Sequence, residues 1–540
     1  MMINRLIHLS SLILLATVLI SVGFSKSTKH NSLTYYINAT KGNNDNSGLS
    51  AESPWKSLNK INKTIFKSGD RILLKRDEVW NESLIFKSSG DSLNPIIIGA
   101  YGKGEKPIIT RMDPYRANWE KFLQNIWKTS CKERYKGKWN APWRMLIEGN
   151  EILLARNMEE LDGNIFKWFY NKDTNEIFLY SKIDPIKYNI RTNLTETAAL
   201  FSNVHDIIVS DIEFRGGYYR SLGLEDNCYN IQITKCIVGK YSKMGIAGSN
   251  FKNCIIDSCI IDSGFEFEYE SNLQRGTHDG IGFWGGIENC TVKNSTIRNW
   301  GHTCITLSSV TGPNKYNKIH DCLIESPDLP YGRALETDGS ETKSNEFYNN
   351  TLRNLTVRSQ IGGSYNHFHH NLIYNYKNSL IKTYGTAQAF SLQGISSETV
   401  GNIMEYNIIA NIDEAAIQYI GDWGNIKGNI FRNNIIYNSG RNPVKKEDKN
   451  IAIMLPENKT IDYQVFKNNW FYNSETEKIV NYKGQIMTIQ EFNSKNGNNG
   501  NVIIKNSFSA SLPKNIVDLE IKLKKDLTQK INFKATDKTK

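Results

Sequence analysis

Two acidic residues separated by one position, Glu336 and Asp338, are the first candidates for chemistry in this sequence. In a β-strand, side chains two positions apart point to the same face, so both carboxylates would lie on one side with backbones about 6.5 Å apart. Such a pair could bind Ca²⁺ through its oxygens, act as the acid and base of a glycosidase, or form a solvated acidic patch. The spacing alone leaves all three open.

The pattern around this pair recurs in five segments: HDGIGFW (278–284), HTCITLS (302–308), GRALETD (332–338), NLTVRSQ (354–360) and NSLIKTY (378–384). If these segments are parallel strands stacked about 4.8 Å apart, their alignment predicts three columns of side chains. The inward column contains Ile281, Ile305, Leu335, Val357 and Ile381. The next, outward column contains Gly282, Thr306, Glu336, Arg358 and Lys382. Two positions further on, the same outer face carries Trp284, Ser308, Asp338, Gln360 and Tyr384.

Arg358 and Lys382 add the groups that β-elimination from an acidic sugar requires. Proton abstraction beside a carboxylate needs that carboxylate neutralised by arginine or Ca²⁺, and a lysine, arginine, histidine or tyrosine to take the proton. Arg358 would neutralise the carboxylate, and Lys382 or Tyr384 would be the base. Glu336 and Asp338 together could hold an ion. The alternative is a salt-bridged row of Glu336, Arg358 and Lys382 without a catalytic role.

The amino-terminal side of this face offers further candidates. Asp279 is an alternative carboxylate for a hydrolase, and His302 is either a substrate-orienting or proton-relaying group or a structural histidine. The residues considered for substrate binding, of which the aromatic ones could stack on sugar rings, are His278, Trp284, Arg333 and Tyr384.

Composition points to a folded protein with an anionic partner. Hydrophobic residues make up 39% of the 540 residues and charged residues 22%, which excludes wholesale disorder. The net charge of +11 favours an acidic ligand. Lysine and arginine are spread evenly, without the dense basic runs typical of nucleic-acid binding. We therefore expect an acidic polysaccharide or oligosaccharide as the partner, and no nucleic acid.

Residues 1–25 are typical of an export signal. Arg5 precedes an apolar run from Leu6 to Val22, and Gly23 and Ser25 are small residues suited to cleavage. A retained membrane anchor is the alternative, because the run approaches spanning length. The expectation is a secreted or periplasmic protein, monomeric and without membrane association after cleavage.

A short motif of the form polar–apolar–apolar–x–Asn dominates the sequence from about residue 204. The first residues of successive copies are 20 to 36 positions apart in the sequence: Cys236, Cys259, Ser295, Cys322, Thr351, Asn371, Asn407, Asn434 and Asn469. A constant motif with a variable spacing indicates fixed coils joined by loops of changing length. Small polar residues in one column could hydrogen-bond from coil to coil. For the cysteines, buried free thiols are the favoured interpretation, with a Cys236–Cys259 bridge as the alternative.

These features predict an all-β protein, a right-handed parallel β-helix of about ten coils, and the sequence resembles that pectate-lyase-like superfamily over residues 33–475. The expected organisation is a signal peptide (1–25), an N-terminal cap with the first coils (26–110), an inserted β elaboration (111–200), the β-helix with the active face (201–475) and a C-terminal cap (476–540). A β-propeller is the weaker alternative, because its period is longer and steadier.

The run ALETDGSETKSNEFYNNTLRNLTVRSQIGG also resembles the core of the chondroitinase-B and alginate-lyase family. That resemblance implies a Ca²⁺ site at Glu336 and Asp338, Lys343 as the base and Arg358 as an assisting arginine. Thr306 and Ser308 stand where a ligand asparagine would be expected. The resemblance thus implies Lys343 as the base, whereas the column of outer-face residues points to Lys382, and both lysines stay open.

Together these observations favour an exported enzyme that degrades an acidic polysaccharide, by β-elimination in the first instance. A glycoside hydrolase that uses paired carboxylates on the same face is the alternative within enzymes. A carbohydrate-binding or adhesin β-helix, which would use this face without chemistry, is the alternative outside them.

Overall fold

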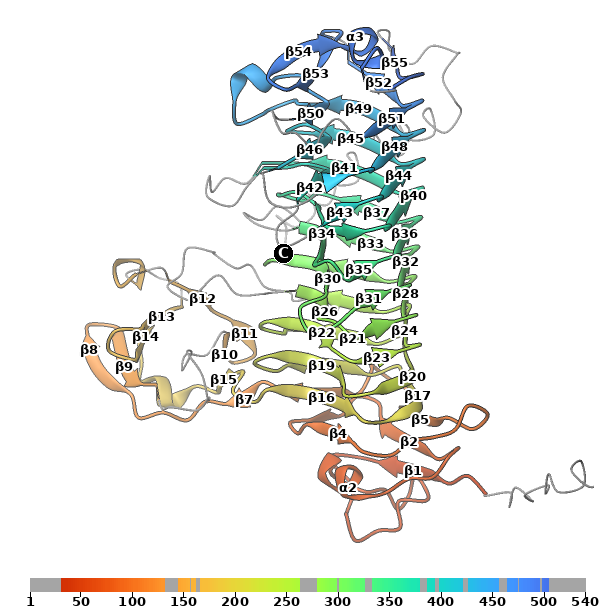
Figure 1. The fold of residues 1–540 in the computed structure, drawn as a ribbon. Coiled ribbons are helices and arrows are strands. Elements are labelled where there is room, and N and C mark those ends of the chain that lie inside the picture. Colours follow the sequence, from red (N-terminus) through yellow and green to blue (C-terminus); the bar gives the residue numbers. More distant parts are fainter. Residues whose placement is uncertain are drawn as a thin grey trace, which may run out of the picture.

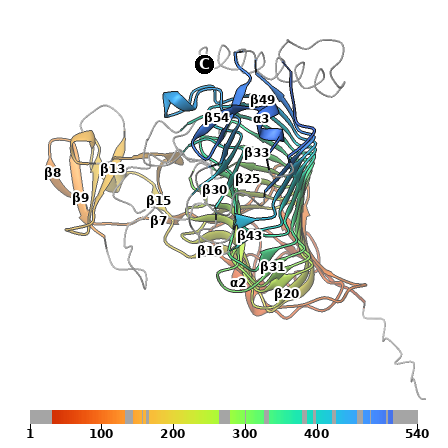
Figure 2. The ribbon, with the colours of Figure 1, turned by 45° about the horizontal axis from the view of Figure 1, so that its top comes forward.

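The computed structural model describes residues 31–131, 144–155, 157–161, 166–262, 279–298, 301–325, 333–378, 386–393, 398–420, 426–455, 464–473, 475–495 and 498–504. These residues form a right-handed parallel β-helix in which each full coil contributes strands to three sheets (Figures 1 and 2). The coils stack from the β1 end to the β54 end, and an inserted unit projects from one side. The two α-helices among the described residues are short: α2 (Leu58–Lys63) and α3 (Ile489–Asn493). None of the described helices is long and apolar enough to cross a lipid bilayer.

Sheet 1 has 13 strands and carries the predicted active face. Its strands are β4 (Leu84–Phe86), β16 (Thr197–Ser202), β19 (Arg220–Glu225), β22 (Met244–Gly248), β26 (Asp279–Phe283), β30 (Thr303–Ser308), β34 (Arg333–Asp338), β38 (Gln360–Ile361), β42 (Phe390–Leu392), β46 (Ile417–Tyr419), β50 (Ile453–Leu455), β53 (Lys478–Tyr482) and β54 (Gln485–Thr488). All pair in parallel except β53 with β54.

Sheet 2 has 20 strands, because most coils cross it as two short strands. They are β1 (Thr34–Ile37), β2 (Arg71–Lys75), β5 (Ile96–Tyr101), β17 (His205–Ser210), β20 (Cys228–Thr234), β23 (Phe251–Lys252), β24 (Ile255–Asp257), β27 (Ile287–Glu288), β28 (Thr291–Lys293), β31 (Asn314–Lys315), β32 (Lys318–His320), β35 (Thr342–Lys343), β36 (Glu346–Tyr348), β39 (Gly363–Ser364), β40 (His367–His369), β43 (Thr399–Val400), β44 (Ile403–Glu405), β47 (Ile426–Lys427), β48 (Ile430–Arg432) and β51 (Val465–Lys467).

Sheet 3 completes each coil with 13 strands, so the described residues form more coils than the ten or so expected. They are β3 (Val79–Trp80), β6 (Ile108–Arg111), β18 (Glu213–Gly216), β21 (Ile237–Gly239), β25 (Ile260–Asp262), β29 (Thr296–Arg298), β33 (Leu323–Glu325), β37 (Thr351–Arg353), β41 (Leu372–Tyr376), β45 (Ile408–Ile412), β49 (Ile435–Ser439), β52 (Trp470–Tyr472) and β55 (Val502–Ile504). The additional coils come from the terminal regions, which also contribute strands to all three sheets.

Asparagine side chains fix the coils to one another at the corner between sheets 2 and 3. Asn407, for example, donates from its amide to Phe368 O and to Asn434 Oδ1, while its own oxygen accepts from Asn371. The column runs through Asn350, Asn371, Asn407, Asn434, Asn469 and Asn501. The predicted ladder is thereby confirmed, but its member in one coil is Asn350 and not Thr351.

The correction at Thr351 has a conformational cause. A residue in the left-handed region precedes each ladder asparagine, and in this coil it is Asn349. The bend at that residue turns the next side chain inward, so Asn350 enters the ladder while Thr351 begins β37. A second ladder, which the sequence motif did not reveal, lies within sheet 2 and contains Asn317, Asn345, Asn366, Asn402, Asn429 and Gln464.

The interior is a continuous apolar column, and all eight cysteines are buried and free. Burial raises the pKa of Cys228 to about 11 and that of Cys322 to about 12. The thiols of four cysteines contact backbone carbonyls of the preceding coil, as in Cys259 Sγ to Ile233 O at 3.5 Å; the other three are Cys228, Cys236 and Cys322. The prediction of packed free thiols is confirmed, and Cys236 and Cys259 form no bridge.

The connections from sheet 3 to sheet 1 vary in length, whereas sheet 2 passes to sheet 3 through two residues in coil after coil. The variable connections range from four residues (299–302) to sixteen (263–278) in the central coils. The longest of them leads from β6 to β16 and contains the inserted unit (Figure 1). This corner is therefore where the chain tolerates elaboration.

The inserted unit consists of two small sheets. One contains β7 (Asp113–Pro114), β10 (Met145–Ile147), β11 (Asn150–Glu151) and β15 (Ile190–Thr192), all antiparallel. The other contains β8 (Glu120–Leu123), β9 (Ile126–Ser130), β12 (Leu153–Leu154), β13 (Lys167–Asn171) and β14 (Glu176–Tyr180). Its core includes Tyr115, Trp168 and Ile177 and extends to Tyr218 of the β-helix.

The asparagine ladder predicts a strong dependence of stability on single amides. Asn407→Ala should lower the free energy of unfolding by about 3 kcal/mol, because it leaves buried amide and carbonyl groups of two neighbouring coils without partners. Chemical denaturation monitored by circular dichroism measures this. The exposed Asn442 is the matched control, and Asn442→Ala should cost under about 0.5 kcal/mol. Equal effects of the two substitutions would contradict the role given to the ladder.

Candidate functional site

The first residues of three consecutive strands of sheet 1 come together at the variable corner. Asp279, Thr303 and Arg333 pair in one column across β26, β30 and β34. Two positions further, Ile281, Ile305 and Leu335 pair and point into the core, as predicted. The adjacent column, Gly282, Thr306 and Glu336, also has the predicted register.

The next coil departs from the predicted register. Gln360 pairs with Glu336, whereas the alignment placed Arg358 beside Glu336 and Gln360 beside Asp338. Residues 354–359 form a connection, and the strand begins only at Gln360. Thr337 fixes this arrangement, because its hydroxyl donates to Gly362 O and its carbonyl accepts from Gly362 N, both at 2.9 Å. Val357 is nevertheless buried, so the connection packs inward.

Glu336 is surrounded by hydrogen-bond donors. Arg333 Nη1 lies 2.9 Å from Oε2, Thr303 Oγ1 donates to Oε2 at 3.2 Å, and Gln360 Nε2 donates to Oε1 at 3.0 Å. Burial raises the pKa of this carboxyl, but Arg333 and His302 outweigh that effect and hold the pKa below its ordinary value. The side chain is 13% exposed. Glu336 is thus an ionised carboxylate that solvent can still reach.

His302 connects Glu336 to a second carboxyl group. Its Nδ1 lies 2.9 Å from Asp279 Oδ1, and its Nε2 lies 3.6 Å from Glu336 Oε2. Asp279 is fully buried, and burial raises its pKa although His302 opposes the shift. Because Asp279 engages Nδ1, it orients the imidazole and leaves Nε2 facing Glu336. The three residues can therefore hold or move a proton on the floor of the site.

Arg358 joins this network indirectly. With the amide of Gln393 oriented so that donors meet acceptors, Gln393 donates to Gln360 Oε1 at 3.2 Å and accepts from Arg358 Nε at 2.8 Å. Arg358 thus acts through Gln393 and Gln360 on Glu336. The sequence placed Gln360 on the outer face but beside Asp338, and it gave no indication of Gln393. For Gln393 the signal was absent, because it follows a three-residue strand, Phe390–Leu392, outside the aligned segments.

Among the other predicted residues, the structure describes Asp338, Trp284 and Lys343. Asp338 is on the outer face two residues beyond Glu336, pairs with Ser308, and accepts from Gly339 N through Oδ1. Trp284 lies over Gly282, where a Cβ would come within 2.8 Å of the indole nitrogen. Lys343 is in sheet 2, bonded to Glu341 at 2.9 Å. His278, Lys382 and Tyr384 lie outside the described residues.

The donors around Glu336 do not suit a Ca²⁺ ion at this carboxylate. Calcium requires several oxygen ligands, whereas Arg333 and Gln360 direct nitrogen donors at the Glu336 oxygens. Within the described residues, no group of three or more His, Cys, Asp and Glu side chains could hold a metal ion. The Glu336 carboxylate, as the structure has it, therefore does not fit the Ca²⁺ ion expected there from the sequence.

Lys243 and Tyr219 extend the site towards the inserted unit, and neither was predicted. Lys243 O accepts from Asp279 N at 2.7 Å, and its ammonium lies 5.9 Å from the Tyr219 ring centroid. Burial lowers the pKa of Lys243. One residue earlier along the chain, Ser242 bonds to Asn193, and Arg144 Nη1 donates to Tyr241 O at 3.0 Å. The inserted unit therefore docks directly beside the Asp279 end of the site.

Comparisons with known proteins show that the chain is similar to individual proteins, but they do not assign it to a family. No family model matches the chain. A stretch of 203 residues is 24% identical to a lacto-N-biosidase of Bifidobacterium longum subsp. longum, covering 34% of this chain and 12% of that protein. The chain thus spans about an eighth of the length of this curated relative.

Several solved structures resemble the chain at low sequence identity. A complex of XylC with xylose has a TM-score of 0.49 at 14% identity, covering 89% of this chain and 87% of that one. The GH136 lacto-N-biosidase from Eubacterium ramulus has a TM-score of 0.43 at 13% identity, covering 88% and 67%. An alginate lyase from Paenibacillus sp. has 0.35 at 12%, covering 71% and 96%. The fold assignment rests on the parallel sheets themselves.

A second buried carboxylate shows by contrast what a structural ion cluster looks like in this fold. Glu325 in sheet 3 accepts from Arg298 Nε at 2.6 Å and from Arg353 Nε at 2.8 Å, so both its oxygens are taken by arginines. Burial raises its pKa, but the two arginines outweigh this and lower it. No histidine is bonded to Glu325 among its described contacts.

The lowered pKa of Glu325 predicts a stability difference that depends on pH. The folded protein favours the ionised form, so the stabilisation is complete above the ordinary pKa of 4.5 and is lost as pH falls through the lower folded value. Glu325→Gln should cost about 1–2 kcal/mol at pH 7, reduced by solvent screening of the arginines, and progressively less below pH 4.5. Melting temperatures of the two proteins, measured between about pH 3 and pH 8, test this. Glu346→Gln, at an exposed pair with Lys318, is the control. A difference independent of pH would contradict the assignment.

Proposed function

We propose that the protein is a carbohydrate-active enzyme that cleaves glycosidic bonds by hydrolysis at the site formed by Asp279, His302 and Glu336. The observation that carries the proposal is the ionised Glu336 carboxylate on the outer face of sheet 1, held by Arg333 at 2.9 Å and faced by His302 at 3.6 Å. Glycoside hydrolysis uses one ionised and one proton-donating carboxyl group beside the scissile bond. Glu336 fits the ionised role.

Asp338 is the best-placed second carboxyl group. It lies two residues beyond Glu336 on the same strand, so the backbones of the two residues are about 6.5 Å apart on one face. Both retaining and inverting separations, about 5 Å and about 6.5–9.5 Å, are within reach of two such side chains. Asp279 cannot touch a sugar, because it is fully buried. It is a positioning residue that acts through His302.

The sequence similarity to a protein named lacto-N-biosidase supports a saccharide as the ligand class. The net charge of +11 and the cluster of Arg333, Arg358 and Lys243 around the site favour a saccharide with acidic groups. Export rests on residues 1–25, outside the described part of the chain, and remains part of the proposal.

β-Elimination is the second candidate, favoured by His302 as a base and Arg333 as the neutralising group. Three parts of the elimination expected from the sequence are weakened by the geometry. Lys343 belongs to another sheet, Arg358 is engaged by Gln393, and Glu336 is enclosed by donors that do not suit Ca²⁺. Hydrolysis requires none of these parts.

Glu336→Gln should lower kcat by about 10²-fold or more, because the amide cannot act as a nucleophile or base. The substitution keeps the shape of the side chain and its bond to Gln360, so circular dichroism should be unchanged. Product analysis on uronic-acid and neutral polysaccharides separates the mechanisms. Hydrolysis yields reducing ends alone, whereas elimination also yields an unsaturated, ultraviolet-absorbing sugar. Glu346→Gln is the control. Full activity of Glu336→Gln would exclude this site.

Asp279→Asn should lower kcat by about tenfold or more with KM nearly unchanged, because an amide no longer selects the imidazole tautomer that places Nε2 opposite Glu336. The pH profile of kcat should shift, since the substitution removes from the network a buried carboxyl group whose pKa is raised by burial. Asp257→Asn, on sheet 2, is the control. A purely structural Asp279 would instead lower the melting temperature and leave the pH profile in place.

A further inference from the structure

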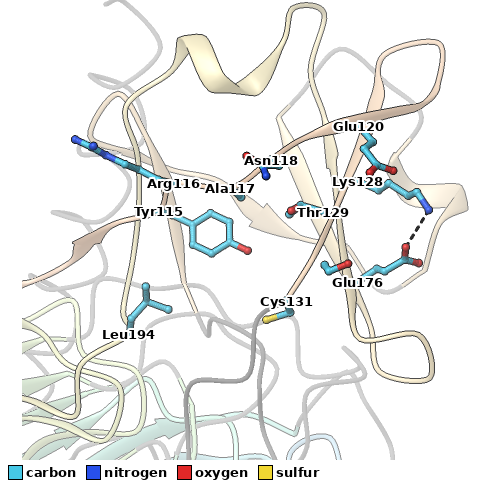
Figure 3. Close-up of a pocket in the computed structure, with 11 residues that line it drawn as sticks. Tyr115, Arg116, Ala117, Asn118, Glu120, Lys128, Thr129, Cys131, Glu176 and Leu194 are labelled. Carbon is cyan, nitrogen blue, oxygen red and sulfur yellow. Dashed lines mark hydrogen bonds and ion pairs between the residues drawn. The ribbon is translucent and has the colours of Figure 1, made fainter.

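The inserted unit contains two hollows separated by the segment 115–118. The smaller, of about 290 Å³, is lined by Arg116, Lys128, Glu120 and Glu176 among others (Figure 3). Lys128 bonds to Glu176 at 3.0 Å, so its charged groups are balanced in number and partly paired. The larger, of about 500 Å³, lies at 114–119 and 185–191. Both volumes approach or fall within the range of ligand pockets.

The larger hollow combines aromatic rings with unbalanced positive charge. Tyr115, Trp119 and Tyr188 line it together with Arg116 and Arg191. Among the described residues that line it, none is acidic. Arg116 lines both hollows, and Figure 3 shows its side chain directed away from Lys128 and Glu176. Arg191 is held in place by a bond from Nη1 to Met112 O at 3.0 Å.

This lining has the chemistry of an acidic-sugar site. Aromatic rings provide apolar faces on which sugar rings stack, and guanidinium groups recognise carboxylate or sulfate by charge-assisted hydrogen bonds. Asn118 and Asn189 add amide donors and acceptors for hydroxyl groups. An apolar peptide or a neutral metabolite would leave the two arginines without a counter-charge.

The position of the insert relates this hollow to the Glu336 site. The unit leaves sheet 3 and returns to sheet 1 at the same corner as Asp279, His302 and Arg333. Its core, which includes Tyr115, packs on Tyr218, and Lys243 lies 5.7 Å from the Tyr218 ring centroid. A continuous run of packed residues therefore leads from the hollow to the catalytic face.

We propose that the hollow lined by Arg116, Trp119, Tyr188 and Arg191 is a distal subsite that binds an acidic saccharide and holds a polymer on the enzyme. The choice of a saccharide rests on the proposed function, whereas the charge and ring pattern stand on the insert alone. The subsite lies outside the catalytic face, so its loss affects polymer binding and leaves the chemical step intact.

Calorimetry with the full-length protein carrying Glu336→Gln tests the proposal. The probes are tetrasaccharides of galacturonate, mannuronate and hyaluronan, with xylotetraose as the neutral comparison. We expect an acidic probe to bind, and Arg116→Gln and Trp119→Ala each to weaken that binding about tenfold. Lys128→Gln, in the smaller hollow, should change it less than twofold.

Three results would overturn the subsite: no acidic probe binds, xylotetraose binds equally well, or both variants bind like the parent. Circular dichroism confirms folding, and the two variants alter different contacts, so a folding defect in one leaves the other informative. Failure of the proposed function is distinguishable. In that case the wild-type protein would cleave none of the polymers, as the Glu336 variants do not, while binding that depends on Arg116 would persist.

Discussion

The stacking of asparagine amides between coils is the interaction on which the rest of this structure depends. Each ladder amide bonds to the next coil's amide and to a backbone carbonyl, as Asn434 does with Asn469 and Met404. These bonds recur with the same pairing, so at the corner of sheets 2 and 3 they fix the height and the register of the coils from Asn350 to Asn501. The apolar interior is non-directional and would tolerate sliding. The ladder therefore determines which side chains of neighbouring coils can meet on sheet 1.

The freedom that the ladder removes at one corner is retained at another. Two residues join sheet 2 to sheet 3 in coil after coil, whereas the path from sheet 3 to sheet 1 takes from three residues to the whole inserted unit. Long connections cost little extra entropy once their ends are fixed. Asp279, His302 and Arg333 lie where these connections rejoin the sheet. The scaffold thus holds the chemical groups, and the variable connections can shape what reaches them.

Periodicity in the sequence was sufficient for the fold and for half of the site. The inward column of Ile281, Ile305 and Leu335 follows from side-chain alternation, and so does the placement of Glu336. The predicted position of Arg358 was wrong, because side-chain alternation determines the face on which a residue lies but not which residues of neighbouring strands pair. A shift of two residues keeps Arg358 on a plausible face while Gln360 takes the place beside Glu336. The prediction of Thr351 as a ladder residue was wrong by one position, because a pattern of polar and apolar residues does not show the left-handed bend at Asn349. Gln393 and Lys243 lie far from Glu336 in sequence, and no local signal marked them.

The pKa values of the two acidic residues that His302 joins are shifted in opposite directions, because burial dominates at Asp279 and neighbouring positive charge dominates at Glu336. Asp279 lies under the sheet surface, where desolvation raises its pKa. Glu336 is nearly as enclosed, yet Arg333 and His302 supply the positive charge that keeps its pKa low. Removing Arg333 would leave desolvation unopposed and favour a neutral Glu336. Arg333, considered from the sequence only for substrate contact, thus sets the charge state of the site. Its position depends in turn on the pairing of Arg333 with Thr303, and so on the stacking of the coils.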